Sequence, residues 1–164
     1  MNTFHELFLR AQAVRRVAIV GGTHGNEATG VAVARYLARH PTAARRPSFE
    51  TMTILANTAA IAANTRYVDE DLNRCFLSEL LGDASRASGE AARARELDLL
   101  IGPKGSEQAH DLVIDLHNTT SNSGIALMSR YQIPACRVSR VVSFCWASLA
   151  RLRGSALVST HSLI

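Results

Sequence analysis

Apolar positions along the first two thirds of the chain recur with two different spacings. Three short aliphatic runs predict buried strands, over residues 16–20, 53–56 and 112–116. Three other stretches have helical spacing or many strong helix formers, and we predict helices over residues 28–40, 57–63 and 90–101. The first of these helices stops before Pro41, and Gly102 and Pro103 follow the last.

This alternation of strands and helices predicts the fold class. It favours an α/β domain with a largely parallel sheet that helices flank. Ligands of such sheets bind beyond the carboxyl ends of the strands. Chemically active residues are therefore expected just after residues 16–20 and 112–116.

The last part of the chain has a different pattern. Residues 138–150 carry apolar side chains at helical spacing, and we predict an amphipathic helix that packs on the sheet rather than on a membrane surface. We divide the chain into an N-terminal extension (1–15), a main domain (16–129) and a divergent basic tail (130–164) that is helical in part.

Length and composition indicate one ordinary globular domain. The chain has 164 residues, of which 47% are hydrophobic and 20% are charged. No apolar run approaches the roughly 18 residues of a membrane span. The three cysteines (Cys75, Cys136 and Cys145) form no spaced framework, which favours a reducing compartment. We therefore expect a soluble, cytoplasmic protein.

The net charge of +4 comes from the tail. No Asp or Glu follows Asp115, whereas five arginines lie in that region: Arg130, Arg137, Arg140, Arg151 and Arg153. They are dispersed and lack interleaved aromatic residues, so we predict no nucleic-acid partner. An exposed sheet edge would promote self-association into a homo-oligomer.

Two short motifs offer a set of metal ligands. Gly-Gly-Thr-His-Gly-Asn-Glu (21–27) follows the first strand run, and Asp-Leu-His-Asn (115–118) ends the third. They supply His24, Glu27 and His117, and catalytic zinc uses two histidines and one glutamate with a fourth position open. Asp115 would point to the same face of the strand as His117 and support it.

Simpler interpretations of these residues remain. His24 would cap a helix, Glu27 would lie in its first turn, and His117 would be a hydrogen-bonded residue at a strand end. The glycines would also suit a phosphate-binding loop, although neither Gly-x-Gly-x-x-Gly nor a P-loop ending is present.

A polar segment between apolar elements is the second candidate for chemistry. Its nine residues hold six charged or amide side chains: Arg66, Asp69, Glu70, Asp71, Asn73 and Arg74. A guanidinium polarises a carbonyl or binds a carboxylate with two parallel hydrogen bonds. The alternative is a solvated loop whose charges compensate one another.

Taken together, the motifs resemble the aspartoacylase/aminoacylase-3 family of zinc amidohydrolases. Four motifs carry the resemblance in the family's order: those at 21–27 and 115–124, with Thr-Arg-Tyr-Val-Asp-Glu-Asp-Leu-Asn-Arg (65–74) and Gly-Pro-Lys-Gly-Ser (102–106) between them. It implies a mixed sheet flanked by helices, as in zinc carboxypeptidases, followed by a C-terminal β-rich domain that this sequence does not contain. It implies hydrolysis of N-acyl amino acids, preferably aromatic ones, to a carboxylate and the free amino acid.

The resemblance also implies roles for individual residues. His24, Glu27 and His117 would bind one Zn²⁺ per chain. Arg66 would polarise the amide carbonyl and help to bind the substrate, and two further residues, Asn73 and Arg74, would bind its carboxylate.

The sequence departs from the family pattern after His117. The family's general-base glutamate lies in a later Gly-x-Glu-x-Gly-Pro-like segment, and this sequence has no acidic residue after Asp115. Loss of a positioned acid/base typically costs about 10²–10⁴ in rate, so we expect a C-terminally truncated family member with weak or absent turnover. The alternative function is a non-catalytic zinc-binding fragment that associates with full-length subunits or other proteins. A phosphate-binding module ranks last.

Overall fold

A five-stranded sheet forms the centre of the molecule. The computed structural model describes residues 14–119, 125–130 and 140–147, with side chains through residue 119. The strand order is β2 (Glu50–Leu55), β1 (Arg16–Gly21), β3 (Leu112–Thr119), β5 (Arg140–Ala147) and β4 (Ile125–Arg130). The first four strands in this order pair in parallel, and β4 pairs antiparallel to β5. The predicted mixed, largely parallel sheet is confirmed.

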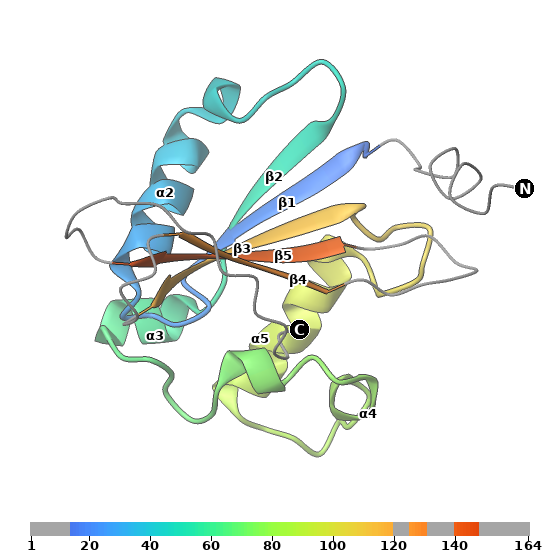
Figure 1. Ribbon diagram of the computed structural model, residues 1–164. Helices are drawn as coiled ribbons and strands as arrows, with labels where there is room; N and C mark the ends of the chain where they lie inside the picture. The colour runs from blue at the N-terminus through green and yellow to red at the C-terminus, as the bar shows by residue number, and fades with distance from the viewer. Residues whose placement is uncertain (1–13, 120–124, 131–139, 148–164) are drawn as a thin grey trace, which may run out of the picture.

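Helices cover both faces of this sheet (Figure 1). The helices are α2 (Ala28–Arg39), α3 (Thr58–Ala63), α4 (Ser78–Leu81) and α5 (Gly89–Ile101), with short 3-10 turns η1 (Pro41–Ala43) and η2 (Leu72–Arg74). The three predicted helices are confirmed as α2, α3 and α5. Among the described residues, no helix has the length and apolar character needed to cross a membrane.

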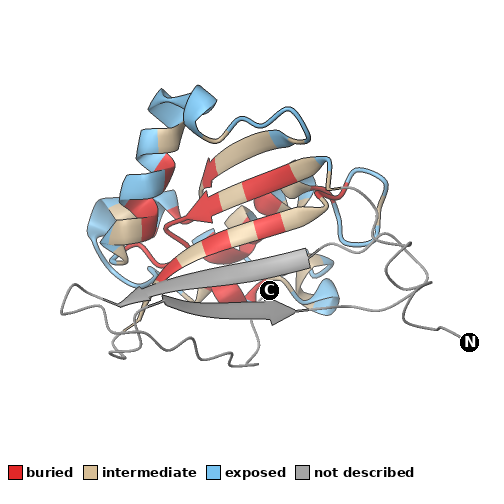
Figure 2. Cartoon of the chain, turned by 45° about the horizontal axis from the view of Figure 1, so that its top comes forward, coloured by how far each residue is buried: buried red, intermediate tan, exposed pale blue. Residues whose placement is uncertain are grey.

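The main hydrophobic core lies between the sheet and α5. Ala18 of β1 and Val113 of β3 point to this side, where Ala94 and Leu97 of α5 and Leu72 of η2 pack against the sheet. Buried positions alternate with partly exposed ones along β3, as expected for a strand with one well-covered face (Figure 2). Because Asp115 and His117 share the buried phase of β3 with Val113, they lie on this same face.

Helix α2 approaches the other face unusually closely. A Cβ atom on Gly21 would lie 2.1 Å from the carbonyl oxygen of Gly30, and one on Gly30 would lie 2.3 Å from that of Leu116. Only glycine permits this contact between backbones. The contact holds the start of α2, and with it Glu27, beside the carboxyl ends of β1 and β3.

The helix predicted over residues 138–150 is wrong. Residues 140–147 instead form β5, which pairs with β3 from Leu112↔Arg140 to Thr119↔Ala147 and with β4 on its other side. The run contains Val141, Val142, Phe144 and Trp146, all residue types that favour strands. Spacing alone does not distinguish a continuous apolar strand from a helix, and sheet pairing decides the outcome here.

Other differences concern the limits of predicted elements. Strand β3 continues three residues beyond the predicted end at residue 116, so His117 lies within the strand. Residues 1–13 of the predicted extension and most of the predicted tail lie outside the described residues. The predicted boundaries at residues 15/16 and 129/130 stay predictions.

Candidate metal centre

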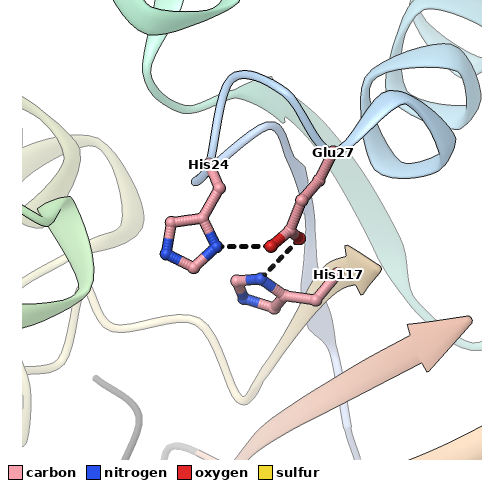
Figure 3. A group of neighbouring side chains, drawn as sticks. All are labelled: His24, Glu27 and His117. Carbon is pink, nitrogen blue, oxygen red and sulfur yellow. Dashed lines mark hydrogen bonds and ion pairs between the residues drawn. The ribbon is translucent and has the colours of Figure 1, made fainter. Parts of the chain in front are cut away.

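The two histidines and the glutamate singled out in the sequence lie together at the carboxyl edge of the sheet (Figure 3). His24 lies in the loop after β1, Glu27 is the N-cap residue of α2, and His117 belongs to β3. Parallel pairing aligns Gly21 with Leu116, which brings the end of β1 beside His117. One potential ligand atom from each side chain lies within 4.8 Å of the others.

Glu27 lies between the two imidazole rings. Its Oε1 lies 2.7 Å from Nδ1 of His24, and its Oε2 lies 2.9 Å from Nδ1 of His117. The backbone N–H of Asn118 donates to Oε2 at 2.8 Å. The rings are 5.0 Å apart between centroids and both histidines are buried. The three potential metal ligands thus converge in a space that is largely closed to solvent.

The second nitrogen of each ring faces another carboxylate. Nε2 of His117 lies 2.6 Å from Oδ2 of Asp115, and Nε2 of His24 lies 3.2 Å from Oδ1 of Asp71. Asp115 is fully buried and accepts a hydrogen bond from Thr23 Oγ1 at 2.8 Å. Metal-binding histidines typically have such a carboxylate behind them, because it fixes the ring and raises its basicity. The donor set therefore fits a divalent cation held through the two Nδ1 atoms and Glu27.

Electrostatics make the cluster strongly anionic at Glu27. Burial alone would raise the pKa of Glu27, but hydrogen bonds from His117 and His24 outweigh it and lower the pKa to about 2. Burial would lower the pKa of His117, yet Asp115 and Glu27 raise it to about 10. Without a metal, the cluster therefore stabilises a positive charge as a proton. A bound cation would replace that charge.

Arg66 lies at the rim of the cluster. Its Nη1 lies 3.7 Å from Oε1 of Glu27, and its Nη2 donates to Oδ2 of Asp71 at 3.2 Å. About half of the side chain is exposed, so the guanidinium remains accessible to a small molecule from solvent. The structure thus brings Arg66 beside the predicted ligands.

Asn73 is the second predicted substrate residue, and it reaches the cluster from η2. It is buried, and its Nδ2 lies 3.3 Å from Nε2 of His24. Its Oδ1 is buried and accepts no hydrogen bond within the part of the chain whose side chains are described. Arg74, the next residue, has an exposed side chain.

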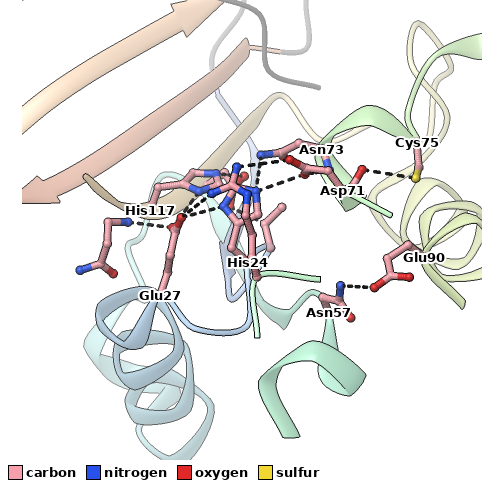
Figure 4. A network of polar contacts seen from close by, with 12 residues as sticks. His24, Glu27, Asn57, Asp71, Asn73, Cys75, Glu90 and His117 are labelled. Carbon is pink, nitrogen blue, oxygen red and sulfur yellow. Dashed lines mark hydrogen bonds and ion pairs between the residues drawn. The ribbon is translucent and has the colours of Figure 1, made fainter. Parts of the chain in front are cut away.

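Sequence reasoning assigned no site role to Asp71, although the residue was noted in the polar segment. In the structure, Oδ1 of Asp71 lies 3.2 Å from Nε2 of His24 (Figure 4). Its Oδ2 accepts a hydrogen bond from Nη2 of Arg66 at 3.2 Å. Burial would raise its pKa, but the nearby His24 and the backbone N–H of Asn73 lower it. The sequence shows that an acidic residue lies two positions before Asn73. Its contact with His24 could not be predicted from spacing, because the two residues are 47 positions apart in the sequence.

A comparison with protein families decides the identity of the fold. Residues 13–161 match the model of the succinylglutamate desuccinylase/aspartoacylase catalytic domain. The chain belongs to this family. It is 53% identical over 116 residues to the N-acyl-aromatic-L-amino acid amidohydrolase (carboxylate-forming) of Rattus norvegicus, covering 70% of this chain and 36% of that protein. It is 45% identical over 121 residues to a probable aspartoacylase of Nostoc sp., covering 74% of this chain and 41% of that protein.

Solved structures of this family share the fold. The crystal structure of murine aminoacylase 3 superposes with a TM-score of 0.70 at 37% sequence identity, over 88% of this chain and 58% of that one. The succinylglutamate desuccinylase of Vibrio parahaemolyticus superposes with a TM-score of 0.56 at 22% identity, over 73% of this chain and 36% of that one. The chain thus spans well under half the length of the two sequence relatives.

A separate hollow lies away from the cluster of His24, Glu27 and His117. It is lined largely by polar and charged residues that include Arg15, Arg45, Glu50 and Asp111. These residues precede or begin β1, β2 and β3, so the hollow opens at the amino ends of the parallel strands. The metal cluster lies at the opposite edge of the sheet.

Proposed function

We propose that the protein is a zinc-dependent amidohydrolase that cleaves N-acyl amino acids, preferably aromatic ones, to a carboxylate and the free amino acid. His24, Glu27 and His117 would hold one zinc ion per chain. The observation that carries the proposal is the convergence of these three side chains, two of them backed by buried or partly buried carboxylates. The name of the rat relative supports the aromatic preference.

The residues of the cluster are prepared to hold a cation. Glu27 stays ionised at neutral pH because its pKa is about 2. Asp115 orients the His117 ring so that Nδ1 faces Glu27. When bound there, zinc would supply a Lewis acid for the acyl carbonyl and lower the pKa of a water molecule toward about 7.

The polar segment would bind the substrate. Arg66 lies 3.7 Å from Glu27 and is half exposed, which suits a guanidinium that polarises the acyl carbonyl. Nδ2 of Asn73 lies 3.3 Å from Nε2 of His24, and we assign to this N–H donor and to Arg74 the binding of the substrate carboxylate. Arginine suits this role because its planar group makes two parallel hydrogen bonds with a carboxylate.

Turnover by this chain is expected to be slow. Residues 116–164 contain no Asp or Glu, so none of them offers a carboxylate that accepts a proton from the attacking water. A positioned general base accelerates a reaction by a factor of about 10²–10⁴.

The alternative of a phosphate-binding glycine loop is less favourable than metal binding, because the anionic Glu27 already lies at the N-terminus of α2.

Zinc binding is the first test. Isothermal titration calorimetry on the metal-free protein should give one zinc per chain. His117→Ala should abolish this binding, because it removes one of three ligands, whereas His40→Ala should not, because His40 lies at the C-terminal end of α2 outside the cluster. A wild-type protein that binds no zinc, or a His117→Ala variant that binds it equally well, contradicts the proposal.

Hydrolysis is the second test. Single-turnover measurements with zinc should detect slow cleavage of N-acetyltyrosine, slower cleavage of N-acetylaspartate, and loss of both in Arg66→Ala. Stoichiometric zinc without hydrolysis would instead support a non-catalytic zinc-binding fragment. Rates as high as those of full-length relatives would contradict the slow turnover that we expect from the lack of Asp and Glu in residues 116–164.

A further inference from the structure

Glu90 is a buried carboxylate that lies outside the metal cluster. It is the second residue of α5, and only 1% of its surface is exposed. Its Oε1 accepts hydrogen bonds from Nδ2 of Asn57 at 3.0 Å and from the backbone N–H of Val68 at 2.7 Å. Its Oε2 accepts one from the backbone N–H of Asp69 at 3.1 Å. All three donors are uncharged and come from outside α5.

The hydrogen bonds keep this buried group ionised. Burial alone would raise the pKa of Glu90, but the donors from Asn57, Val68 and Asp69 lower it below its ordinary value. The N-terminus of α5 also favours a negative charge. A buried charge is costly unless it is fully hydrogen-bonded. Removal of even one acceptor oxygen should therefore destabilise the segments that donate hydrogen bonds to it.

These segments also carry residues of the proposed site. Val68 and Asp69 lie between Arg66 and Asp71, the two residues that contact each other at the rim of the cluster. The junction is reciprocal, because Oδ2 of Asp69 accepts a hydrogen bond from the backbone N–H of Gly89 at 3.0 Å. Residues 66–71 are thus joined to the start of α5 from both sides.

Asn57 links the same carboxylate to the loop after β1. Its backbone N–H donates to the carbonyl oxygen of Gly22 at 3.0 Å, and its Oδ1 caps α3 by accepting from Ala60 N at 3.1 Å. The backbone of Gly25 in turn donates to the carbonyl oxygen of Arg66 at 3.2 Å. The metal ligands themselves come from the β1–α2 loop and β3, whereas the described hydrogen bonds of the Glu90 carboxylate come from Asn57, Val68 and Asp69.

We propose that Glu90 is a positioning residue, whose buried carboxylate fixes residues 66–69 against α5 and so holds Arg66 toward the metal cluster. Asp71, which contacts His24, is held separately as the N-cap residue of η2. Its effect on turnover rests on the function proposed above. Its effect on the segment does not. The inference therefore separates two groups of residues. The position of the metal ligands His24, Glu27 and His117 does not depend on Glu90, whereas the position of the segment that carries Arg66 does.

The test compares Glu90→Gln with Glu96→Gln in the full chain. Glutamine keeps the shape but replaces one accepting oxygen with an NH₂ group, so at least one of the N–H donors loses its acceptor. Glu96 lies on the same helix, is largely exposed and pairs with Arg93. In Glu90→Gln, amide hydrogen exchange over residues 67–71 should accelerate about tenfold or more, while β1 and β3 stay protected. Glu96→Gln should exchange like the wild type.

Zinc affinity and turnover complete the test. Zinc affinity of Glu90→Gln should stay within about threefold of wild type, while kcat/KM should fall about 100-fold, as expected for a misplaced substrate-facing group. Equal exchange over residues 67–71 in the two variants overturns the inference, and so does a uniform acceleration throughout the molecule. If the wild type shows no turnover, the proposed hydrolysis fails, but the exchange and zinc measurements still decide the role of Glu90.

A milder variant covers the case in which Glu90→Gln does not fold. Asp69 is exposed, and Asp69→Asn weakens only its side of the junction, the acceptor for Gly89 N. It should accelerate exchange over residues 67–71 by a smaller factor and leave zinc affinity unchanged. Unchanged exchange in this variant would count against the inference.

Discussion

Gly30 offers a strict test of how α2 is held against the sheet. Replacement by alanine would place a Cβ atom 2.3 Å from the carbonyl oxygen of Leu116, far inside the 3.0 Å that such contacts keep. The obstructing atom belongs to the backbone of β3, so no side chain can turn away to make room. The helix has to shift as a whole, and Glu27 lies at its N-terminal end.

The magnitude follows from two opposing terms. Alanine is favoured over glycine inside a helix by about 1 kcal/mol. Overpacking a well-packed core costs about 1–3 kcal/mol, and contact with rigid backbone places Gly30→Ala at the upper end of that range. We therefore expect a net loss of about 2 kcal/mol in the free energy of unfolding. For a chain of this length that corresponds to a fall of about 4–8 °C in Tm.

Urea unfolding followed by circular dichroism measures this change, and Gly89→Ala is the matched control. Gly89 also lies in a helix, but a Cβ atom there would meet Oδ2 of Asp69 at an ordinary 3.6 Å. Gly89→Ala should therefore leave stability unchanged or raise it by up to about 1 kcal/mol. The reasoning is refuted if Gly30→Ala is as stable as the wild type, or if the two variants lose equal stability.

Two further predictions concern the buried carboxylates. Asp115→Asn should weaken zinc binding about 10–100-fold in competition with a chelator, because the carboxylate that orients His117 is lost, and unchanged affinity would contradict that role. The folded-state pKa of Glu90 lies below its ordinary value of 4.5, so its contribution to stability is complete above that pH and is lost as pH falls through the folded pKa. Thermal unfolding between about pH 6 and pH 3 should therefore show a flatter acid limb for Glu90→Gln than for the wild type, and parallel curves would argue against an ionised Glu90.

The sequence predicted the elements whose signals are local. Residues 16–20 and 112–116 are aliphatic runs, and the helix over 28–40 has one apolar stripe and a proline after its end, so period and breaker agree. In residues 138–150 the hydrophobic period and the chain-breaking residues do not agree in this way. An apolar run in a central strand is apolar on both faces, so its spacing alone does not identify it as a strand. Their place between β3 and β4 depends on pairing partners that lie elsewhere in the chain.

The candidate ligands were predictable for a topological reason. The carboxyl ends of neighbouring parallel strands lie at the same edge of a sheet. His24 and His117 are 93 positions apart in the sequence, but they were expected to lie close together if β1 and β3 were neighbours. Glu90 was not predictable in the same way. In sequence it is one more good helix former, and the direction of its carboxylate depends on how α5 packs against Asn57 and residues 68–69.

The site is thus assembled from two parts that different packing contacts hold in place. The glycine contact between α2 and β3 sets the position of Glu27 relative to His117, and Gly30→Ala disturbs it directly. The buried carboxylate of Glu90, at the start of α5 on the other face of the sheet, sets the position of Arg66 through the backbone of Val68 and Asp69. If the two contacts act independently, the two substitutions should have additive effects on stability but different effects on the site. Gly30→Ala should weaken zinc binding, whereas Glu90→Gln should spare it, and a loss of zinc in both would mean that the site responds as one unit.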